Sequence, residues 1–223
     1  RATLASLRQA KNQTPHKLIL VDNASDDLAC EKIFAAFTRH VSEASLEWEY
    51  LQQDKNLGFS GGNNIGIARF LEDPEISHIC LLNADVIVPD HWLDHLLGTG
   101  CDIVSAVTNK ADSEQCVPVD YSLELSECLD ERSEVIRPDA ISRINAFAAD
   151  WREAWNGNLV EVDVTFFCVL IAVPVIRKVG LLDEVFFPGG YEDDDYCLRA
   201  RGHGYNVHLA RDVFIHHWGS ASF

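Results

Sequence analysis

Residues 78–88 of the chain read "HICLLNADVIV". An apolar run of strand length breaks off there at Asn83 and Asp85. Such a run, apolar on both faces, is typical of a strand buried in a parallel sheet. A carboxylate at the end of a buried strand is costly unless it is paired or binds a metal, and divalent metals favour carboxylate oxygens. Asp85 is therefore a candidate metal ligand, with a turn-forming Asn83–Asp85 pair as the alternative.

A second stretch, "KLILVDNAS" (residues 17–25), has the same form and ends its apolar run at Asp22 and Asn23. Other segments, such as "LACEKIFAAFTRH" (residues 28–40), space their apolar residues at helical intervals. Strands that alternate with helices predict an α/β fold with a mainly parallel sheet, in which ligands bind at the carboxyl ends of strands. Asp22 could accept hydrogen bonds from a base or ribose there, while the polar residues after it could cap a helix.

Composition and charge narrow the range of partners. The 223 residues suffice for one α/β domain with a substantial core. The formal net charge of −17 makes nucleic acid a poor partner, because phosphate binding needs a surplus of lysine and arginine. The same charge opposes unaided docking on an anionic membrane. It suits a protein that handles anions through a bound divalent cation.

The cysteines and apolar runs indicate the compartment. The seven cysteines are odd in number and contain no CxxC pair, which argues against a zinc knuckle or a disulfide framework. The longest apolar run, residues 164–176, is too short to span a bilayer. We expect a cytoplasmic protein with reduced thiols, associated at most peripherally with the inner face of the membrane.

The glycine-rich stretch "GFSGGNNIG" (residues 58–66) has two interpretations. It is neither a P-loop nor a GxGxxG fingerprint. A tight turn before a helix is the simpler interpretation of the residues alone. The alternative is a close backbone approach to a ligand, with the N-terminus of the helix facing an anion.

Acidic and histidine residues near the end of the chain are candidates for catalysis. "GGYEDDDYCLRARGHGYN" (residues 189–206) contains four consecutive acids. The macrodipole favours acids at a helix start, and Asp195 could pair with Arg199. An ionised carboxylate among the four could also take a proton from an attacking hydroxyl. His216 and His217 are adjacent, so on a strand at most one of them faces a given site.

Five stretches occur in order along nearly the whole chain: "LILVDNASDD", "NLGFSGGNNIGI", "LLNADVIVPDHWLDHLL", "VGLLDEVFFPGGYEDDDYCLRARGHGYNV" and "DVFIHHWGSASF". Together they closely resemble family 2 glycosyltransferases with the Rossmann-like GT-A fold, above all bacterial rhamnosyltransferase-like enzymes of cell-surface polysaccharide synthesis. The resemblance implies one GT-A domain over residues 1–223. Residues 1–108 would form its nucleotide-sugar-binding half, and residues 109–223 its acceptor-binding and catalytic half.

The resemblance also implies which residues bind the donor and the metal. The positions that match the family's nucleotide-sugar site are Asp22, Asn23, Gly61, Asn64, Asn83 and Asp85. Asp85 matches the last acid of the DxD motif, which holds Mg²⁺ or Mn²⁺ on the sugar-nucleotide diphosphate. His217 matches a late histidine that completes the metal site, with His216 as the alternative.

For the acceptor, the resemblance implies a base and its surroundings. Asp193 matches the aspartate of the "ED" motif, which acts as general base. Glu192 is expected to shape the acceptor site, and Trp218 to line the same pocket. Asp194 and Asp195 are expected to serve the helix start.

The chain departs from the family pattern at several positions. The family begins with a strand similar to "VSVVIPTYN", which is absent here, so we expect a fragment of a longer protein. Asn83 replaces the first acid of the DxD motif. Phe166 stands where relatives often carry glycine, and Ala172 where they often carry arginine, which affects the fit of donor or acceptor.

The activity implied by the resemblance is an inverting, metal-dependent sugar transfer. The donor would be a UDP- or dTDP-sugar, and the acceptor a glycan or lipid-linked glycan of cell-surface polysaccharide synthesis. The alternative is a non-catalytic sugar-nucleotide or glycan-binding module derived from this fold. Residues 135–155 have helical periodicity, and we expect that helix to pack on the sheet, with a position bordering the acceptor or the membrane as the alternative.

Overall fold

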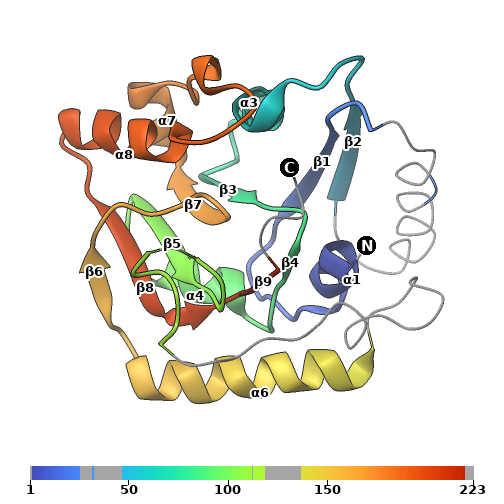
Figure 1. Ribbon diagram of the computed structural model, residues 1–223, viewed down its shortest axis with the longest axis vertical. Coiled ribbons are helices and arrows are strands. Elements are labelled where there is room, and N and C mark those ends of the chain that lie inside the picture. Colours follow the sequence, from blue (N-terminus) through green and yellow to red (C-terminus); the bar gives the residue numbers. More distant parts are fainter. Residues whose placement is uncertain (1, 26–31, 33–46, 112, 119–136, 219–223) are drawn as a thin grey trace.

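The protein is represented by a computed structural model that describes residues 2–25, 32, 47–111, 113–118 and 137–218. Its central element is a five-stranded sheet with the strand order β3-β7-β5-β8-β6 (Figure 1). These strands are β3 (His78–Leu82), β5 (Ile103–Val107), β6 (Leu159–Glu161), β7 (Cys168–Ala172) and β8 (Val207–Phe214). The helix predicted at residues 28–40 lies almost wholly outside the described residues.

The strand directions make this a mixed sheet. β5 and β8 are parallel, whereas β7 is antiparallel to both β3 and β5, and β6 is antiparallel to β8. β3, β5 and β8 therefore run in one direction, and β6 and β7 run against them. The α/β architecture predicted from the alternation of strands and helices is confirmed.

Two smaller sheets complete the described strands. β1 (Lys17–Asp22) pairs in parallel with β2 (Glu47–Gln52), and β4 (Val86–Ile87) pairs antiparallel with β9 (His216–His217). The apolar run of β1 predicts a buried strand, but its side chains from Leu18 to Val21 are only half-buried. Within the described residues β1 pairs with β2 alone, so it lacks the second flanking strand that helps to bury β5 and β7.

Helices cover both faces of the central sheet, because the side chains of its strands alternate between the faces. The helical elements are α1 (Ala2–Gln9), α3 (Gly58–Phe70), α4 (Trp92–Gly98), α6 (Pro138–Trp155), α7 (Val173–Val179), η1 (Glu184–Phe186) and α8 (Glu192–Gly202). On one face Ile103 and Ile171 belong to an apolar cluster shared with α7 and α8. On the other face Val104 and Leu170 pack in a cluster with α4.

Helix α6 packs against β8, as expected for the periodic segment 135–155. The rings of Phe147 and Phe214 meet edge to face at 4.7 Å, and the Trp151 indole donates a hydrogen bond to the carbonyl of Arg211 at 2.6 Å. In Figure 1 the helix lies along the bottom of the molecule, away from α3, α7 and α8 at the top. The apolar face of α6 is thus used in the protein's own core.

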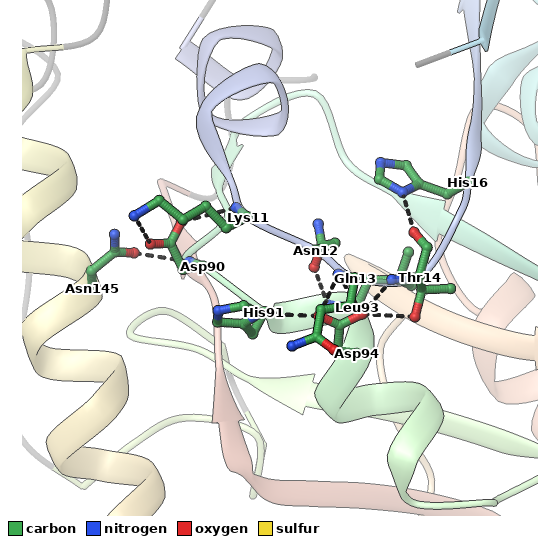
Figure 2. Close-up of polar contacts among 10 residues, drawn as sticks. All are labelled: Lys11, Asn12, Gln13, Thr14, His16, Asp90, His91, Leu93, Asp94 and Asn145. Atoms are coloured by element: carbon green, nitrogen blue, oxygen red, sulfur yellow. Dashed lines mark hydrogen bonds and ion pairs between the residues drawn. The ribbon is translucent and has the colours of Figure 1, made fainter. Parts of the chain in front are cut away.

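One carboxylate fastens the linker between α1 and β1 to α4 (Figure 2). Asp94 accepts hydrogen bonds from the backbone N–H groups of Gln13 (2.8 Å) and Thr14 (2.9 Å) and from the Thr14 hydroxyl (2.7 Å), and it contacts Nδ1 of His91 at 3.1 Å. Burial alone would raise the pKa of Asp94, but these hydrogen bonds hold it far below its ordinary value. The linker leads into β1, so this contact helps to fix the strand that ends in Asp22.

We expect Asp94→Ala to lower the free energy of unfolding by about 2 kcal/mol, because several donors lose their acceptor. The ionised carboxylate has a depressed pKa in the folded state. The carboxylate therefore contributes fully to the free energy of unfolding above the unfolded-state pKa of about 4. This contribution is lost as the pH falls toward the lower folded-state pKa. Urea unfolding of wild type and variant from pH 7 downward measures the difference, which should shrink below pH of about 4.

The exposed Asp150 on α6 provides the matched control for this prediction. Asp150→Ala should change the free energy of unfolding by less than about 0.5 kcal/mol. Equal effects of the two substitutions, or a pH-independent effect of Asp94→Ala, would contradict the role of Asp94.

Candidate active site

The proposed metal ligands Asp85 and His217 lie side by side. Asp85 directly precedes β4, and the pairing of β4 with β9 sets Val86 opposite His217. Oδ1 of Asp85 lies 3.1 Å from Nε2 of His217. Asp85 is only 7% exposed, and the His217 side chain is nearly as buried. A β-pairing therefore unites two residues that are 132 positions apart in the sequence.

His217 is held in place through its ring and through its backbone. It stacks on Phe167 with ring centroids 5.2 Å apart. Its backbone N–H donates to the side-chain oxygen of Asn109 at 2.8 Å, and its carbonyl accepts from the same side chain at 3.1 Å. Binding of a ligand to this ring therefore costs little side-chain conformational entropy, because the ring is already fixed. Asn109 and Phe167 were not predicted as site residues, because no acid or histidine directly adjoins either of them in the sequence.

The neighbouring His216 is turned into the core, as expected for adjacent residues on a strand. It is fully buried, and its ring packs edge-on against Trp218 at 5.4 Å. Burial lowers the pKa of His216 to about 4, and the neighbouring His217 contributes to the same shift. Trp218 also donates its backbone N–H to the carbonyl of Asp85 at 3.0 Å. The geometry favours His217 over His216 as the partner of Asp85.

The donor set fits a divalent cation held jointly with substrate. A carboxylate oxygen and an imidazole nitrogen are both common ligands of divalent metals, and Mg²⁺ and Mn²⁺ sites often take their remaining ligands from phosphates and water. Within the described ranges no three His, Cys, Asp or Glu side chains converge to hold an ion. Asp85 and His217 would therefore supply two ligands and leave the others to a diphosphate.

Asp193, the proposed base, lies half-buried in the first turn of α8. Burial raises the pKa of Asp193, while the backbone N–H of Asp194, which donates to the carboxylate at 2.9 Å, and that of Phe166 partly oppose the rise. A carboxyl with a raised pKa that is held by backbone donors is suited to accept a proton near neutral pH.

The other acids of the stretch 192–195 have separate partners. Glu192 is buried, and its carboxylate accepts the backbone N–H of Gly190, which closes the turn before α8. Burial raises the pKa of Glu192 as well. Asp195 pairs with Arg199 at 2.7 Å, as its spacing predicted. Asp194 is exposed.

A dipeptide before β7 joins the two sides of the site. The backbone N–H of Phe166 helps to lower the pKa of Asp193, and the carbonyl of Phe167 accepts from the N–H of Asn83 at 2.8 Å. Phe167 also stacks on His217. Because consecutive Cα atoms are about 3.8 Å apart, one short segment of backbone borders both the base and the metal side. Sequence reasoning did not identify this link, because backbone groups and a ring stack make it.

The two departures from the family pattern lie in the core. Phe166 is buried, and its ring meets that of Tyr196 edge to face at 5.7 Å. Ala172 is buried at the end of β7, and its N–H donates to the carbonyl of Asp102 at 2.8 Å. The larger side chain at 166 is thus accommodated by packing on α8.

At the end of β1, Asp22 is buried and already has partners. Its carboxylate accepts the Tyr50 hydroxyl at 2.5 Å and the backbone N–H of Ser25 at 2.9 Å. Burial alone would raise the pKa of Asp22, but these hydrogen bonds lower it, so the group is an anion at neutral pH. Tyr50 was not predicted. The parallel register sets Leu20 opposite Tyr50, so a correct pairing of β1 with β2 would have found it.

Asn23 and Asn64 tie loops of the site together. Asn23 accepts the N–H of Leu57 at 2.8 Å and donates to the carbonyl of Gly58 at 2.9 Å, which fixes the start of α3. Asn64 exchanges two hydrogen bonds with the backbone of Leu182, at 2.9 and 3.0 Å. The structure therefore gives both amides a positioning role beside any role in donor binding.

The glycines of "GFSGGNNIG" allow close packing at the start of α3. A Cβ at Gly61 would lie 2.7 Å from Cβ of Leu57, so a larger residue would force a backbone shift. A Cβ at Gly62 would lie 3.3 Å from the side-chain nitrogen of Asn23. The tight turn before a helix that the sequence suggested is not what the structure shows, because Gly61, Gly62 and Gly66 lie inside α3 and only Gly58, with φ of 71°, has a turn-like backbone. The alternative, a close backbone approach to a ligand, stays a prediction.

Within the described residues none of the helices has the length and apolar character needed to cross a bilayer. This finding agrees with the absence of a long apolar run in the sequence.

Comparisons with known proteins point to one family. The family described as "Glycosyl transferase family 2" matches residues 1–117, more than half of the chain. A curated relative, the low-salt glycan biosynthesis hexosyltransferase Agl10 of Haloferax volcanii, is 27% identical over 163 residues, which are 71% of this chain and 48% of that protein. The chain thus spans about half the length of the curated relative it matches.

Solved structures agree on the fold. The crystal structure of GalNAc-T7 with UDP, GalNAc and Mn²⁺ matches with a TM-score of 0.64 at 11% identity, over 96% of this chain and 40% of that chain. At so low an identity the likeness establishes the GT-A fold alone. Since the family match covers more than half of the sequence and the fold agrees with it, the chain belongs to glycosyltransferase family 2.

Proposed function

We propose that this protein transfers a sugar from a nucleotide-diphosphate sugar to a glycan or lipid-linked glycan, with inversion and with a divalent cation. The observation that carries the proposal is the Phe166–Phe167 dipeptide, whose Phe166 N–H influences the pKa of Asp193 and whose Phe167 contacts Asn83 and His217. A general base and a metal-binding pair on two sides of one site are what a direct displacement needs.

On the donor side, Asp85 and His217 would hold Mg²⁺ or Mn²⁺ against the diphosphate. The cation would neutralise the negative charge that grows on the leaving diphosphate. Phe167 keeps the His217 ring in place, and the Asn83–Phe167 hydrogen bond fixes the loop that carries Asp85. Asp22, anionic and buried at the end of β1, is proposed to accept hydrogen bonds from the nucleoside.

On the acceptor side, Asp193 takes the proton of the attacking hydroxyl. The backbone N–H of Asp194 donates to its carboxylate at 2.9 Å and helps to orient it. Attack from the face opposite the leaving diphosphate breaks the anomeric C–O bond as the new glycosidic bond forms, which inverts the anomeric centre. Holding both substrates in line removes much of the entropic part of the barrier.

The comparisons support the choice of substrates. The Haloferax relative is named as a hexosyltransferase of glycan biosynthesis, and GalNAc-T7 was crystallised with UDP and Mn²⁺. We propose a UDP- or dTDP-sugar donor and an acceptor of cell-surface polysaccharide synthesis at the cytoplasmic face of the membrane.

A donor screen tests the proposal. UDP-, dTDP- and GDP-sugars are incubated with the protein and Mn²⁺, and release of nucleoside diphosphate is measured, together with donor binding by calorimetry. Release with one class of donor, abolished by EDTA and restored by Mn²⁺, is expected. Tight binding of a donor without any release, with or without added glycan acceptors, would instead support the non-catalytic binding module.

The pH dependence of the reaction gives a second prediction. Asp193 acts as a base only when ionised, and burial raises the pKa of Asp193. Activity should therefore fall as the pH drops through that raised pKa. The fall should come at a higher pH than the pKa of an ordinary aspartate, which is about 4. A pH–rate profile of nucleoside diphosphate release measures this acid limb. The assignment would be contradicted if activity fell only at or below the pKa of an ordinary aspartate. It would also be contradicted if the pH of this fall did not change in Asp193→Glu.

A further inference from the structure

We propose that Phe187 and Tyr191 form an aromatic platform that receives a sugar ring of the acceptor beside Asp193. The inference rests on the proposed function. Tyr191 is 75% exposed and Phe187 60% exposed. Among the described residues, five of the seven large hydrophobic side chains that are exposed fall within residues 181–198, next to the acidic stretch. Such a concentration of exposed apolar side chains is typical of a binding surface.

The backbone of Tyr191 gives an independent indication. Tyr191 is the N-cap of α8 and has φ of 72°, in the left-handed region. A non-glycine residue is strained there, whereas glycine is not. Gly189 and Gly190 directly precede it, so the chain uses glycine freely in this turn. Tyrosine at the strained position therefore suggests that its side chain has a function.

The platform is fixed close to the base. Asp193 follows Tyr191 by two residues, so their Cα atoms lie within about 7 Å. The hydrogen bond from Gly190 to Glu192 closes the turn between the two aromatic residues and the base.

The other end of this loop is anchored on α3. The carbonyl of Pro188 accepts the N–H of Phe59 at 2.7 Å. A Cβ at Gly58 would lie 2.9 Å from the ring of Phe187, so that ring rests directly on the glycine. Two exposed aromatic side chains are thus held on a fixed loop at the edge of the proposed acceptor site.

Charge around the platform identifies the class of ligand. Asp183, Glu184 and Asp194 lie within four residues of Phe187 or Tyr191 in the sequence and are all exposed. The face of an aromatic ring is itself the negative part of its quadrupole. Anionic lipid headgroups and phosphates are therefore disfavoured. A sugar ring is neutral, presents weakly positive C–H groups to an aromatic face, and has hydroxyls whose hydrogen bonds carboxylates can accept. We therefore assign the platform to a pyranose ring of the acceptor glycan.

The test uses the full chain and four probes, the methyl α-glycosides of glucose, galactose, mannose and rhamnose, with binding followed by saturation-transfer NMR. At least one glycoside should bind saturably to the wild-type protein. Its affinity should be about tenfold lower in Tyr191→Gly and unchanged in Tyr191→Phe. Leu198→Ala, at a residue 63% exposed on the same helix, is the matched control and should leave binding unchanged. Tyr191→Gly relieves backbone strain, so its melting temperature should not fall, which separates lost binding from lost folding.

Three outcomes would overturn the inference. The first is unchanged glycoside binding in Tyr191→Gly, and the second is that none of the four glycosides binds. The third is that glycosides do not bind, whereas phosphatidylcholine–phosphatidylglycerol vesicles bind to the wild-type protein and not to Tyr191→Gly. The last result would assign the surface to a membrane. None of these readouts needs turnover, so they are independent of the proposed function, which fails separately if Asp193→Asn leaves nucleoside diphosphate release unchanged.

Discussion

Asp193→Asn should reduce the release of nucleoside diphosphate about a thousandfold and leave donor binding intact. The substitution keeps the size and polarity of the side chain, so the hydrogen bond from the backbone N–H of Asp194 can persist. It removes only the ability to take a proton. Because Asp193 lies in the half of the site away from Asp85 and His217, the affinity for the metal–donor complex should change little.

The matched control for this prediction is Asp195→Asn, two residues further along the same helix. Asp195 pairs with Arg199 and has no part in the proposed chemistry. Its loss should lower stability slightly, by about 0.5 kcal/mol, and leave turnover close to that of wild type. Comparable losses of turnover in both variants would show that Asp193 matters for the helix and not as a base.

Asp85→Asn should weaken Mn²⁺-dependent donor binding by roughly a hundredfold or more. The carboxylate would be the only anionic protein ligand among the described residues of the proposed metal site. Losing about 3 kcal/mol of metal–carboxylate interaction corresponds to that factor. Calorimetric titration of UDP in the presence and absence of Mn²⁺ measures the effect, which should vanish when the metal is left out.

Asp90→Asn is the control for Asp85→Asn. Asp90 follows the same strand and accepts the backbone N–H of Lys11 at 3.0 Å, away from His217. This substitution should leave the Mn²⁺ dependence of binding as in wild type. If Asp85→Asn behaved in the same way, another group would have to hold the cation, and the assignment of Asp85 would be wrong.

The strands and the fold class could be predicted because their signals are local. Runs such as "ICLL" and "LILV" are apolar on both faces, and they end in polar residues where the strands end. The pair Asp85–His217 could not come from local pattern, because β4 and β9 are two residues long and far apart in sequence. The resemblance to a family, and not the periodicity, suggested that pair.

The remaining contacts depend on register and on backbone groups. "VTFFCVLIAV" is an almost uniform apolar run, so nothing in it marks Phe166 and Phe167 as the link between base and metal side. Tyr50 meets Asp22 only through the register of β1 and β2. The half-buried state of β1 was likewise not predicted, because burial of a strand depends on its neighbours and not on its own apolar residues.

The most direct test of the central claim measures binding and turnover side by side in Asp193→Asn and Asp85→Asn. The claim is that base and metal pair serve one reaction from two sides of one site. It predicts that Asp193→Asn binds the Mn²⁺–donor complex like wild type without turning it over, and that Asp85→Asn loses the Mn²⁺-dependent binding itself. Wild-type turnover in Asp193→Asn, or wild-type Mn²⁺-dependent binding in Asp85→Asn, would contradict the claim.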